Sequence, residues 1–273
     1  MQVLVRASKF APYFAVKVTP SCASQVFMFN VQDVIKSVCH KMSSTGANLG
    51  GSYPSALNTI QDMARARDTV AQFFNCAPAE VVFGANMTSL TSHVSRSVGR
   101  DLSRSDNVVV TMLDHDANVT PWTRVAEDAG AQVRVIPFTT DQCTLDMSAL
   151  RDNVDTNTAL VALGAAANSC GSITDIKTAV RMVKEASGGR ALVYVDAVHF
   201  APHRLIDVQE LGCDFLVCSS YKFCGPHSGA MYGRSSVLES LRPYKLRACT
   251  DLLPAPASSQ SSKWETGENH FMR

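Results

Sequence analysis

Short runs of apolar residues recur along this chain, and most are followed by a segment with helical periodicity. The predicted strands span residues 81–83, 108–113, 132–138, 159–165, 191–196 and 215–218. Apolar and polar residues do not alternate within these runs, which is typical of strands that are buried on both faces. The order of elements therefore predicts an α/β fold in which helices cover both faces of a doubly wound, mostly parallel sheet.

The segments between these strands have the apolar spacing of amphipathic helices. From residue 55 to 74, apolar residues recur at steps of three and four, with charged residues between them. A capping pattern at Ser172 and Asp175 and a glycine pair at 188–189 mark the two ends of another helix. The predicted helices span residues 31–42, 55–74, 88–100, 119–129, 146–154 and 173–186.

Composition indicates a globular chain and gives no sign of a nucleic-acid-binding or membrane-spanning protein. The chain has 273 residues, of which 46% are hydrophobic and 18% charged, enough to bury a large core. A formal net charge of +1 gives no reason to expect nucleic acid or a membrane surface as partner, and no apolar run reaches the ~18 residues that a bilayer span needs. The nine cysteines contain no C-x-x-C pair, so we expect reduced thiols in an intracellular protein.

Two ionisable residues closely follow predicted strands. Asp196 ends the run at 191–196, and Lys222 follows the run at 215–218 within an aromatic segment. A carboxylate or an ammonium group is costly to place among apolar side chains. Because ligands of parallel sheets bind beyond the carboxyl ends of the strands, this pair indicates a site there.

Lys222 and Asp196 each have two interpretations. An amine in apolar surroundings has a lowered pKa and can form a Schiff base, whereas a loop lysine can simply extend into solvent. Asp196 can hold a protonated cofactor ring, or it can cap a helix. The two residues together favour pyridoxal phosphate, which needs a lysine for its aldehyde and a carboxylate for its ring nitrogen.

Two turns follow other predicted strands. Residues 84–88 form a turn of small residues that opens a helix, and the free N–H groups of such a turn suit a phosphate. Residues 114–118 (DHDAN) follow the strand at 108–113. Four residues therefore lie at or just past predicted strand ends, namely His115, Asn168, Asp196 and Lys222.

Several motifs resemble, in order, those of the class V aminotransferase and cysteine desulfurase family, and most closely its cysteine desulfurase-like subgroup. They are residues 46–51 (GANLGG), 83–88 (FGANMT), 113–122 (LDHDANVTPW), 167–172 (ANSCGS), 196–199 (DAVH), 219–222 (SSYK) and 264–267 (WETG). Their order is far more specific than any one motif. The resemblance implies a fold-type I large domain that binds pyridoxal 5'-phosphate, acts on an amino acid and forms a homodimer.

The same resemblance assigns roles to individual residues. Lys222 would form the Schiff base, Asp196 would pair with the pyridinium nitrogen, and His115 would stack on the ring. Asn168 and His199 would lie near the ring hydroxyl. The phosphate contacts would be the Met87 backbone N–H, Thr88 and Ser219.

The chain departs from the family pattern at several points. His199 stands where desulfurases usually have Gln, and Tyr221 stands where they have His. Glu268 occupies the position of a threonine that, in the family, reaches the cofactor phosphate of the partner subunit. A loop that the family has before residue 31 is missing from the pattern. By this resemblance the chain also stops at Arg273, ahead of the small domain that carries a substrate-binding arginine and the catalytic cysteine, so we expect no sulfur release from cysteine.

The expected organisation has three parts: an N-terminal arm and helix at 1–45, a cofactor-binding large domain at 46–253, and a linker with a truncated C-terminal segment at 254–273. The first 32 residues contain no Asp or Glu, which is mildly typical of a transit peptide. We expect a cytoplasmic protein, and the acid-free N-terminus makes a mitochondrial or other organellar location the alternative.

Two other functions remain open at the level of sequence. One is a truncated, catalytically inactive family member. The other is a metal-dependent hydrolase with ligands from Asp114, His115, Asp116, Asp196, His199 and His203. Because no local metal-binding motif such as H-E-x-x-H is present, we predict no metal site.

Overall fold

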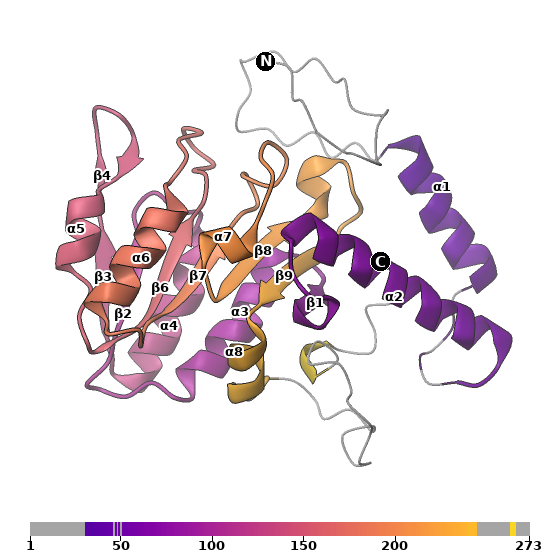
Figure 1. Cartoon of the computed structure of the whole chain (residues 1–273), viewed down its shortest axis with the longest axis horizontal. Helices are drawn as coiled ribbons and strands as arrows, with labels where there is room; N and C mark the ends of the chain where they lie inside the picture. Colours follow the sequence, from indigo (N-terminus) through magenta and orange to yellow (C-terminus); the bar gives the residue numbers. More distant parts are fainter. Residues whose placement is uncertain (1–30, 46, 48, 50, 245–262, 266–273) are drawn as a thin grey trace.

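A computed structural model describes residues 31–45, 47, 49, 51–244 and 263–265, and within them one sheet has the strand order β1-β9-β8-β7-β6-β2-β3 (Figure 1). Strands β2, β3, β6, β7 and β8 are parallel, and β9 runs antiparallel between β8 and β1. The prediction of a doubly wound, mostly parallel sheet is confirmed. The strands are β1 (Val81–Gly84), β2 (Asn107–Thr111), β3 (Gln132–Ile136), β6 (Thr158–Gly164), β7 (Leu192–Asp196), β8 (Phe215–Ser219) and β9 (Gly229–Gly233).

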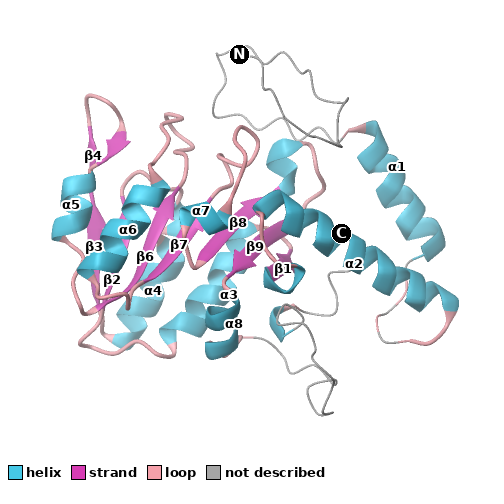
Figure 2. Cartoon of the chain, in the orientation of Figure 1, coloured by secondary structure: helices cyan, strands magenta, loops and turns pink. Residues whose placement is uncertain are grey.

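Helices cover both faces of this sheet, as Figure 2 shows. Helices α5, α6 and α7 lie on one face, and α3, α4 and α8 lie on the other. The helices are α1 (Gln32–His40), α2 (Pro54–Phe74), α3 (Met87–Gly99), α4 (Thr120–Ala129), α5 (Met147–Asp152), α6 (Ile176–Ala186), α7 (Val208–Leu211) and α8 (Ser235–Ser240). Shorter turns are the π-helix η1 (Lys41–Thr45) and the 3-10 helices η2 (Pro78–Glu80), η3 (Asp116–Asn118) and η4 (Ser220–Phe223).

The central strands are buried on both sides, which explains why their sequences do not alternate. In β7, Val193 and Val195 belong to one core cluster, whereas Tyr194 between them belongs to the other. All three side chains are fully buried. The Tyr194 hydroxyl finds a partner in the Thr91 hydroxyl at 2.9 Å, so this buried polar group is satisfied. No helix in the described part of the chain combines the length and apolar character needed to cross a membrane.

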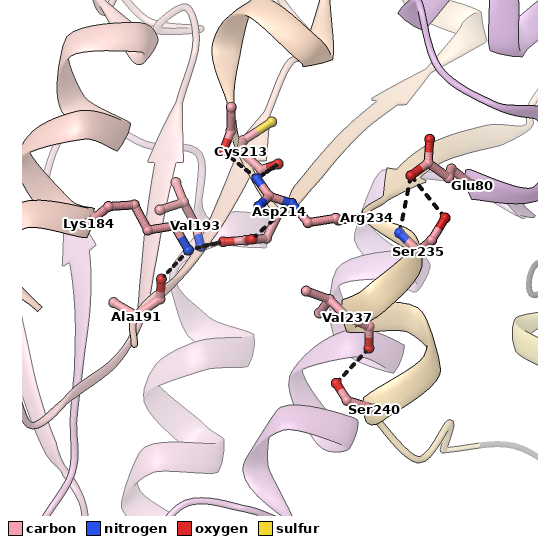
Figure 3. A network of polar contacts seen from close by, with 11 residues as sticks. Glu80, Lys184, Ala191, Val193, Cys213, Asp214, Arg234, Ser235, Val237 and Ser240 are labelled. Carbon is pink, nitrogen blue, oxygen red and sulfur yellow. Dashed lines mark hydrogen bonds and ion pairs between the residues drawn. The ribbon is translucent and has the colours of Figure 1, made fainter. Parts of the chain in front are cut away.

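Asp214 ties the amino ends of the central strands together (Figure 3). Its carboxylate accepts a 2.8 Å hydrogen bond from the Val193 N–H and forms a 2.7 Å ion pair with Lys184 Nζ. Arg234 Nε lies 3.4 Å from the other carboxylate oxygen, and Lys184 also donates to the carbonyl of Ala191. A carboxylate with these partners links α6, β7 and the end of β9 at one edge of the sheet. Figure 3 also shows Ser235, at the start of α8, donating to Glu80 of η2.

Residues 263–265 pack against the sheet although they are distant in sequence. Trp264 is almost completely buried, and its Nε1 donates a 3.2 Å hydrogen bond to the carbonyl of Leu238 in α8. Glu265 accepts from both terminal nitrogens of Arg67 in α2 and from the Phe83 N–H in β1. Two-pronged pairing of this kind fixes geometry as well as charge, so the segment fastens α2 to the edge of the sheet.

Most predicted elements agree with the structure, and the clearest differences concern residues 132–138, the helix predicted from residue 173 and strand β9. The run predicted as one strand at 132–138 ends at Ile136, because Pro137 has no N–H for the ladder; a separate hairpin follows, formed by β4 (Phe138–Thr139) and β5 (Thr144–Leu145). The helix predicted from residue 173 begins at Ile176. Its N-cap is Asp175, whose carboxylate accepts from the Thr178 N–H at 3.1 Å.

Strand β9 was absent from the prediction because its sequence, GAMYG, begins and ends with glycine. The sequence-based expectations for residues 1–30, for the linker at 254–262 and for Glu268 lie outside the described residues.

Candidate active site

The carboxyl ends of β1 and β8 lie on either side of the first residue of β9. Gly229 pairs with Gly84 in β1 and with Ser219 in β8. A Cβ atom at Gly229 would lie 2.6 Å from the main-chain carbonyl carbon of Asn86, so glycine is required for the turn between β1 and α3 to approach β8. This approach lets the Met87 N–H donate a 2.8 Å hydrogen bond to Ser219 Oγ. Two residues predicted as phosphate contacts are thus adjacent and buried.

The first turn of α3 carries the third predicted phosphate contact. Asn86 caps the helix, and its Oδ1 accepts a 2.8 Å hydrogen bond from the Ser89 N–H. Thr88 is exposed and lines an open groove of about 430 Å³ that runs along the helix. The Thr88 hydroxyl therefore faces solvent at the positive end of the helix dipole.

Asp196 ends β7 and is only 9% exposed. Its Oδ1 accepts a 2.8 Å hydrogen bond from the Val198 N–H. This bond closes a turn and does not cap a helix, because the next helix, α7, begins at Val208. No hydrogen bond reaches Oδ2 from the described residues. Burial raises the pKa of the Asp196 carboxyl to about 6, and the nearby charge of Lys222 acts in the opposite direction. The carboxylate is therefore ionised at neutral pH but incompletely solvated.

Lys222 lies in η4, directly after β8. Since β7 and β8 are parallel neighbours, Lys222 and Asp196 share one edge of the sheet. Desolvation lowers the pKa of the Lys222 ammonium group from its ordinary value, while the charge of Asp196 opposes that shift. Lys222 is half-buried, with its Nζ 5.5 Å from the centre of the Tyr221 ring. It is neither a solvated surface lysine nor a fully enclosed one.

A closed loop holds Lys222 in place. The Ser220 hydroxyl donates a 2.6 Å hydrogen bond to the carbonyl of Pro226, and the Ser220 N–H bonds to the carbonyl of Ser228. Tyr221 stacks on His227 with ring centroids 4.8 Å apart. These contacts join both ends of the loop, so the lysine backbone is fixed by local hydrogen bonds rather than by the lysine itself.

Two histidines complete the same edge. Burial, together with the positive charges of Lys222, His115 and His203, lowers the pKa of His199 to about 4. His199 is therefore neutral at pH 7. His115 is exposed, and its Nδ1 accepts a 3.0 Å hydrogen bond from the Ala117 N–H, which leaves the proton of the neutral ring on Nε2.

The whole arrangement has counterparts among known proteins. The family model described as aminotransferase class V matches residues 29–270. The chain belongs to the class V aminotransferase family. A cysteine desulfurase of Yersinia pestis bv. Antiqua (strain Angola) is 35% identical over 198 residues, which are 71% of this chain and 48% of the relative. The chain thus spans about half the length of the curated relatives it matches.

Solved structures of cysteine desulfurases share the fold of this class V chain. The apo structure from Thermococcus onnurineus NA1 superimposes with a TM-score of 0.79 at 23% identity, covering 89% of this chain and 62% of the other. The cysteine desulfurase CsdA from Escherichia coli gives a TM-score of 0.75 at 25% identity, with coverage of 89% and 62%. These neighbours place the class V chain in fold type I, in agreement with its sheet.

Class V aminotransferases depend on pyridoxal phosphate, and the described residues fit that group. Oδ2 of Asp196 has no hydrogen bond from the described residues, which leaves an acceptor for a ring N–H. Lys222 has the lowered pKa that attack on an aldehyde requires. One predicted contact fits less simply: the Met87 N–H already donates to Ser219 Oγ, so a phosphate at this turn would have to share or replace that bond.

Asn168, the remaining predicted site residue of this class V chain, stands apart from the others. Asn168 is half-buried in the loop after β6, and no hydrogen bond joins it to the other site residues described. The metal alternative gains no support, because no group of three or more His, Cys, Asp or Glu among residues 31–244 and 263–265, as far as they are described, is arranged to hold an ion.

Asp114 was not among the predicted cofactor contacts, yet its half-buried carboxyl is strongly desolvated. Burial, together with the charge of Asp196, raises the pKa of the Asp114 carboxyl to about 8. Its Oδ2 accepts a 3.0 Å hydrogen bond from Asn118 Nδ2, and a Cβ atom at Gly164 would overlap its other oxygen. The useful signal in the sequence was the position of Asp114 directly after a strand, the same signal that identified Asp196.

Proposed function

We propose that this chain forms the cofactor-binding part of a pyridoxal phosphate enzyme that acts on an amino acid. The observation that carries the proposal is the pairing of a desolvated lysine with a buried carboxylate at the ends of two adjacent parallel strands. Shifted pKa values of opposite character at one sheet edge are a frequent mark of a functional site. The cysteine desulfurases to which the chain is similar support an amino acid as the substrate class.

Each residue has a task that its surroundings permit. Asp196 would accept a hydrogen bond from the ring N–H at Oδ2 and keep that nitrogen protonated. Lys222 would supply the amine that bonds to the aldehyde carbon, and its lowered pKa increases the fraction of neutral amine at pH 7. Pyridoxal phosphate, when bound, supplies an electron sink for cleavage of a bond at the substrate α-carbon.

The remaining residues would bind and orient the cofactor. Neutral His199 and half-buried Asn168 would face the ring hydroxyl, and the exposed ring of His115 would cover one face of the pyridine. The hydroxyls of Ser219 and Thr88 and the Met87 N–H would bind the phosphate at the start of α3. None of these contacts requires a change in the sheet.

The domain organisation is part of the proposal. Residues 1–45 would form an arm and helix, 46–253 the large domain, and 254–273 a linking segment. Packing of Trp264 and Glu265 onto α8, α2 and β1 supports a linking segment that returns to the large domain.

We also propose a homodimer, supported by apolar side chains that are 40–69% exposed along α1, η1 and the first half of α2. These side chains are Ile35, Met42, Tyr53, Leu57 and Ile60. Sedimentation should show a dimer at micromolar concentration, and the double variant Leu57→Asp/Ile60→Asp should sediment as a monomer. Leu205→Asp, which changes an even more exposed apolar side chain elsewhere, should leave the dimer intact. A monomer for the parent chain would contradict this part of the proposal.

The central test is covalent capture of the cofactor. The purified chain mixed with pyridoxal phosphate should develop a visible absorption band, and borohydride should then fix the cofactor to one peptide, the one that contains Lys222. Lys222→Ala should lose both the band and the label. Lys177→Ala removes a surface lysine that is 63% exposed, and it should keep both. Equal labelling of several lysines, or labelling that persists in Lys222→Ala, would overturn the proposal.

A further inference from the structure

Two cysteines meet where a hairpin touches the loop after β6. Cys143 is the residue before β5, at the tip of the β4–β5 hairpin, and Cys170 follows Asn168 by two residues. The Cys170 Sγ lies 3.6 Å from the carbonyl oxygen of Cys143 and 3.3 Å from the Ser172 hydroxyl. Cys170 is exposed and Cys143 is partly exposed, so both thiols can be reached from solvent.

The Cys170 thiol differs chemically from the buried ones. Hydrogen bonds from Ser172 hold the pKa of Cys170 below its ordinary value, which increases the thiolate fraction at neutral pH. Burial has the opposite effect on Cys76, Cys213 and Cys218, whose thiol pKa values rise to about 12. A thiolate with access to solvent is the reactive form of cysteine, whereas buried thiols of this kind are inert.

The backbone of Cys143 is unusual as well. Its φ of 51° lies in the left-handed region, which non-glycine residues other than Asn and Asp seldom adopt. The Cys143 Sγ lies 3.9 Å from the carbonyl of Thr140, inside the hairpin turn. Cys170 touches the main chain of Cys143, and the Cys143 side chain is also among the groups that lower the pKa of the Cys170 thiol, so the two residues are direct neighbours.

We propose that Cys143 and Cys170 form a redox-active pair that a peroxide converts to an intramolecular disulfide. The Cys170 thiolate attacks one peroxide oxygen and the O–O bond breaks, which leaves a sulfenic acid on Cys170. The displaced hydroxide takes up a proton and departs as water. The Cys143 sulfur then attacks the Cys170 sulfur, the S–O bond breaks, and a second water leaves. The two thiols lose two electrons and two protons in total, and hydrogen peroxide is reduced to two waters.

The disulfide would join the hairpin to the loop that carries Asn168. Reduced, the two segments are linked near this point by the weak contacts of the Cys170 thiol; oxidised, they share a covalent bond. The pair therefore provides a modification site two residues from a residue of the candidate active site. The redox chemistry itself does not depend on the proposed function.

The test uses the full chain and hydrogen peroxide. After brief treatment, alkylation of the remaining thiols and non-reducing peptide mapping should reveal a peptide that links Cys143 to Cys170. Cys143→Ser should stop at the sulfenic acid, which dimedone traps on Cys170. Ser172→Ala should slow the oxidation of Cys170 several-fold, because it removes the main cause of the lowered thiol pKa. Cys39→Ser removes another exposed thiol and should change nothing.

Two results would overturn the proposal. One is oxidation of Cys170 no faster than that of Cys39 in the same molecules. The other is a set of disulfides in which Cys170 pairs indiscriminately, or in which the same Cys143 link forms equally fast in urea, because the pairing would then owe nothing to the fold.

Discussion

Two buried aspartates at opposite ends of the neighbouring strands β7 and β8 have contrasting surroundings. Asp214, before β8, is paired with Lys184 and Arg234 and accepts from a backbone N–H, so each carboxylate oxygen has a partner. Asp196, at the end of β7, accepts one backbone hydrogen bond and keeps Oδ2 without one from the described residues. Both side chains are equally difficult to desolvate, so the difference lies in what compensates the charge.

This comparison separates a structural carboxylate from a candidate functional one. A fully paired carboxylate contributes to folding, and removing it leaves its partners uncompensated. A buried carboxylate with an unused acceptor destabilises the protein without ligand, and it is available to a cationic or N–H group from outside. The free energy of unfolding should therefore change in opposite directions when the two residues are neutralised.

The largest effect is expected at Asp214. Asp214→Ala should lower the free energy of unfolding by about 3 kcal/mol, because it leaves the Val193 N–H without its acceptor and two cations without their counter-charge. Asp214→Asn should lose less, since its amide oxygen can still accept from Val193. Lys177→Ala breaks a surface pair whose side chains are each 63% exposed and should stay within about 0.5 kcal/mol in urea unfolding. A loss no larger than that of Lys177→Ala would contradict the structural role of Asp214.

Asp196→Asn should have the opposite sign. The carboxyl pKa is about 6 in the folded chain against an ordinary value of 3.8, so the folded state binds the proton more tightly. The stability that the protonated Asp196 carboxyl contributes is fully present below pH 3.8 and is lost as the pH rises through 6. Without cofactor, Asp196→Asn should thus raise the free energy of unfolding by about 2–3 kcal/mol at pH 8, at about 1.4 kcal/mol per pKa unit.

The pH dependence provides the control for Asp196. At pH 4 the parent carboxyl is already protonated in the folded state, so the gain should nearly vanish. Asp106→Asn is the matched variant: Asp106 is also buried, but hydrogen bonds from Ser103 and Arg190 outweigh burial and lower its pKa. It should destabilise the chain at pH 8. Destabilisation by Asp196→Asn at pH 8 would show that Asp196 is a structural carboxylate like Asp214.

The sequence was sufficient to predict the sheet because burial on both faces leaves a direct trace in it. Val193, Tyr194 and Val195 are consecutive apolar residues for the same physical reason that they point alternately into two cores. Asp196 and Lys222 could be found because a charged residue at or shortly after the end of such a run is costly and therefore conspicuous.

Other features depend on contacts between distant segments and left no local trace. The carboxylate of Asp114 lies where a side chain at Gly164, in β6, would clash with it. Strand β9 begins at Gly229, whose lack of a side chain follows from the approach of Asn86 and weakens any strand pattern. The bond between Met87 and Ser219 likewise required the observed pairing of β9 with both neighbours.

His199 extends the comparison to a base. Its pKa is lowered to about 4 by burial and nearby positive charge, so the unfolded state binds more protons between pH 4 and 6.5. The free energy of unfolding should therefore fall as the pH falls from 6.5 to 4, because the folded state resists protonation of His199. The expected loss is about 1–2 kcal/mol once the partial exposure of the ring is allowed for. Asp196 acts in the opposite direction over nearly the same range. His199→Asn should flatten the acid slope, and NMR of the His199 ring should show no protonation above pH 5; titration near pH 6.5 would contradict the assignment.

The smallest effect is expected at Ser219, where a single neutral hydrogen bond is involved. Ser219→Ala removes the acceptor of the buried Met87 N–H and should lower the free energy of unfolding by about 1 kcal/mol. Ser240→Ala removes an exposed hydroxyl that bonds to the carbonyl of Val237, and it should stay within about 0.5 kcal/mol. Hydrogen exchange resolves the site directly, because the Met87 amide should lose protection in Ser219→Ala alone.

Pyridoxal phosphate sharpens the Ser219 experiment. If the cofactor phosphate binds the Met87 N–H as proposed, adding the cofactor should restore protection of that amide in Ser219→Ala, because a phosphate oxygen would replace the missing hydroxyl. Inorganic phosphate at the same concentration serves as the control for a non-specific anion effect. Protection of the Met87 amide that is unchanged by Ser219→Ala without cofactor would contradict the hydrogen bond itself. If protection is lost and the cofactor does not restore it, the hydrogen bond between Met87 and Ser219 is supported, but Met87 is not a phosphate contact.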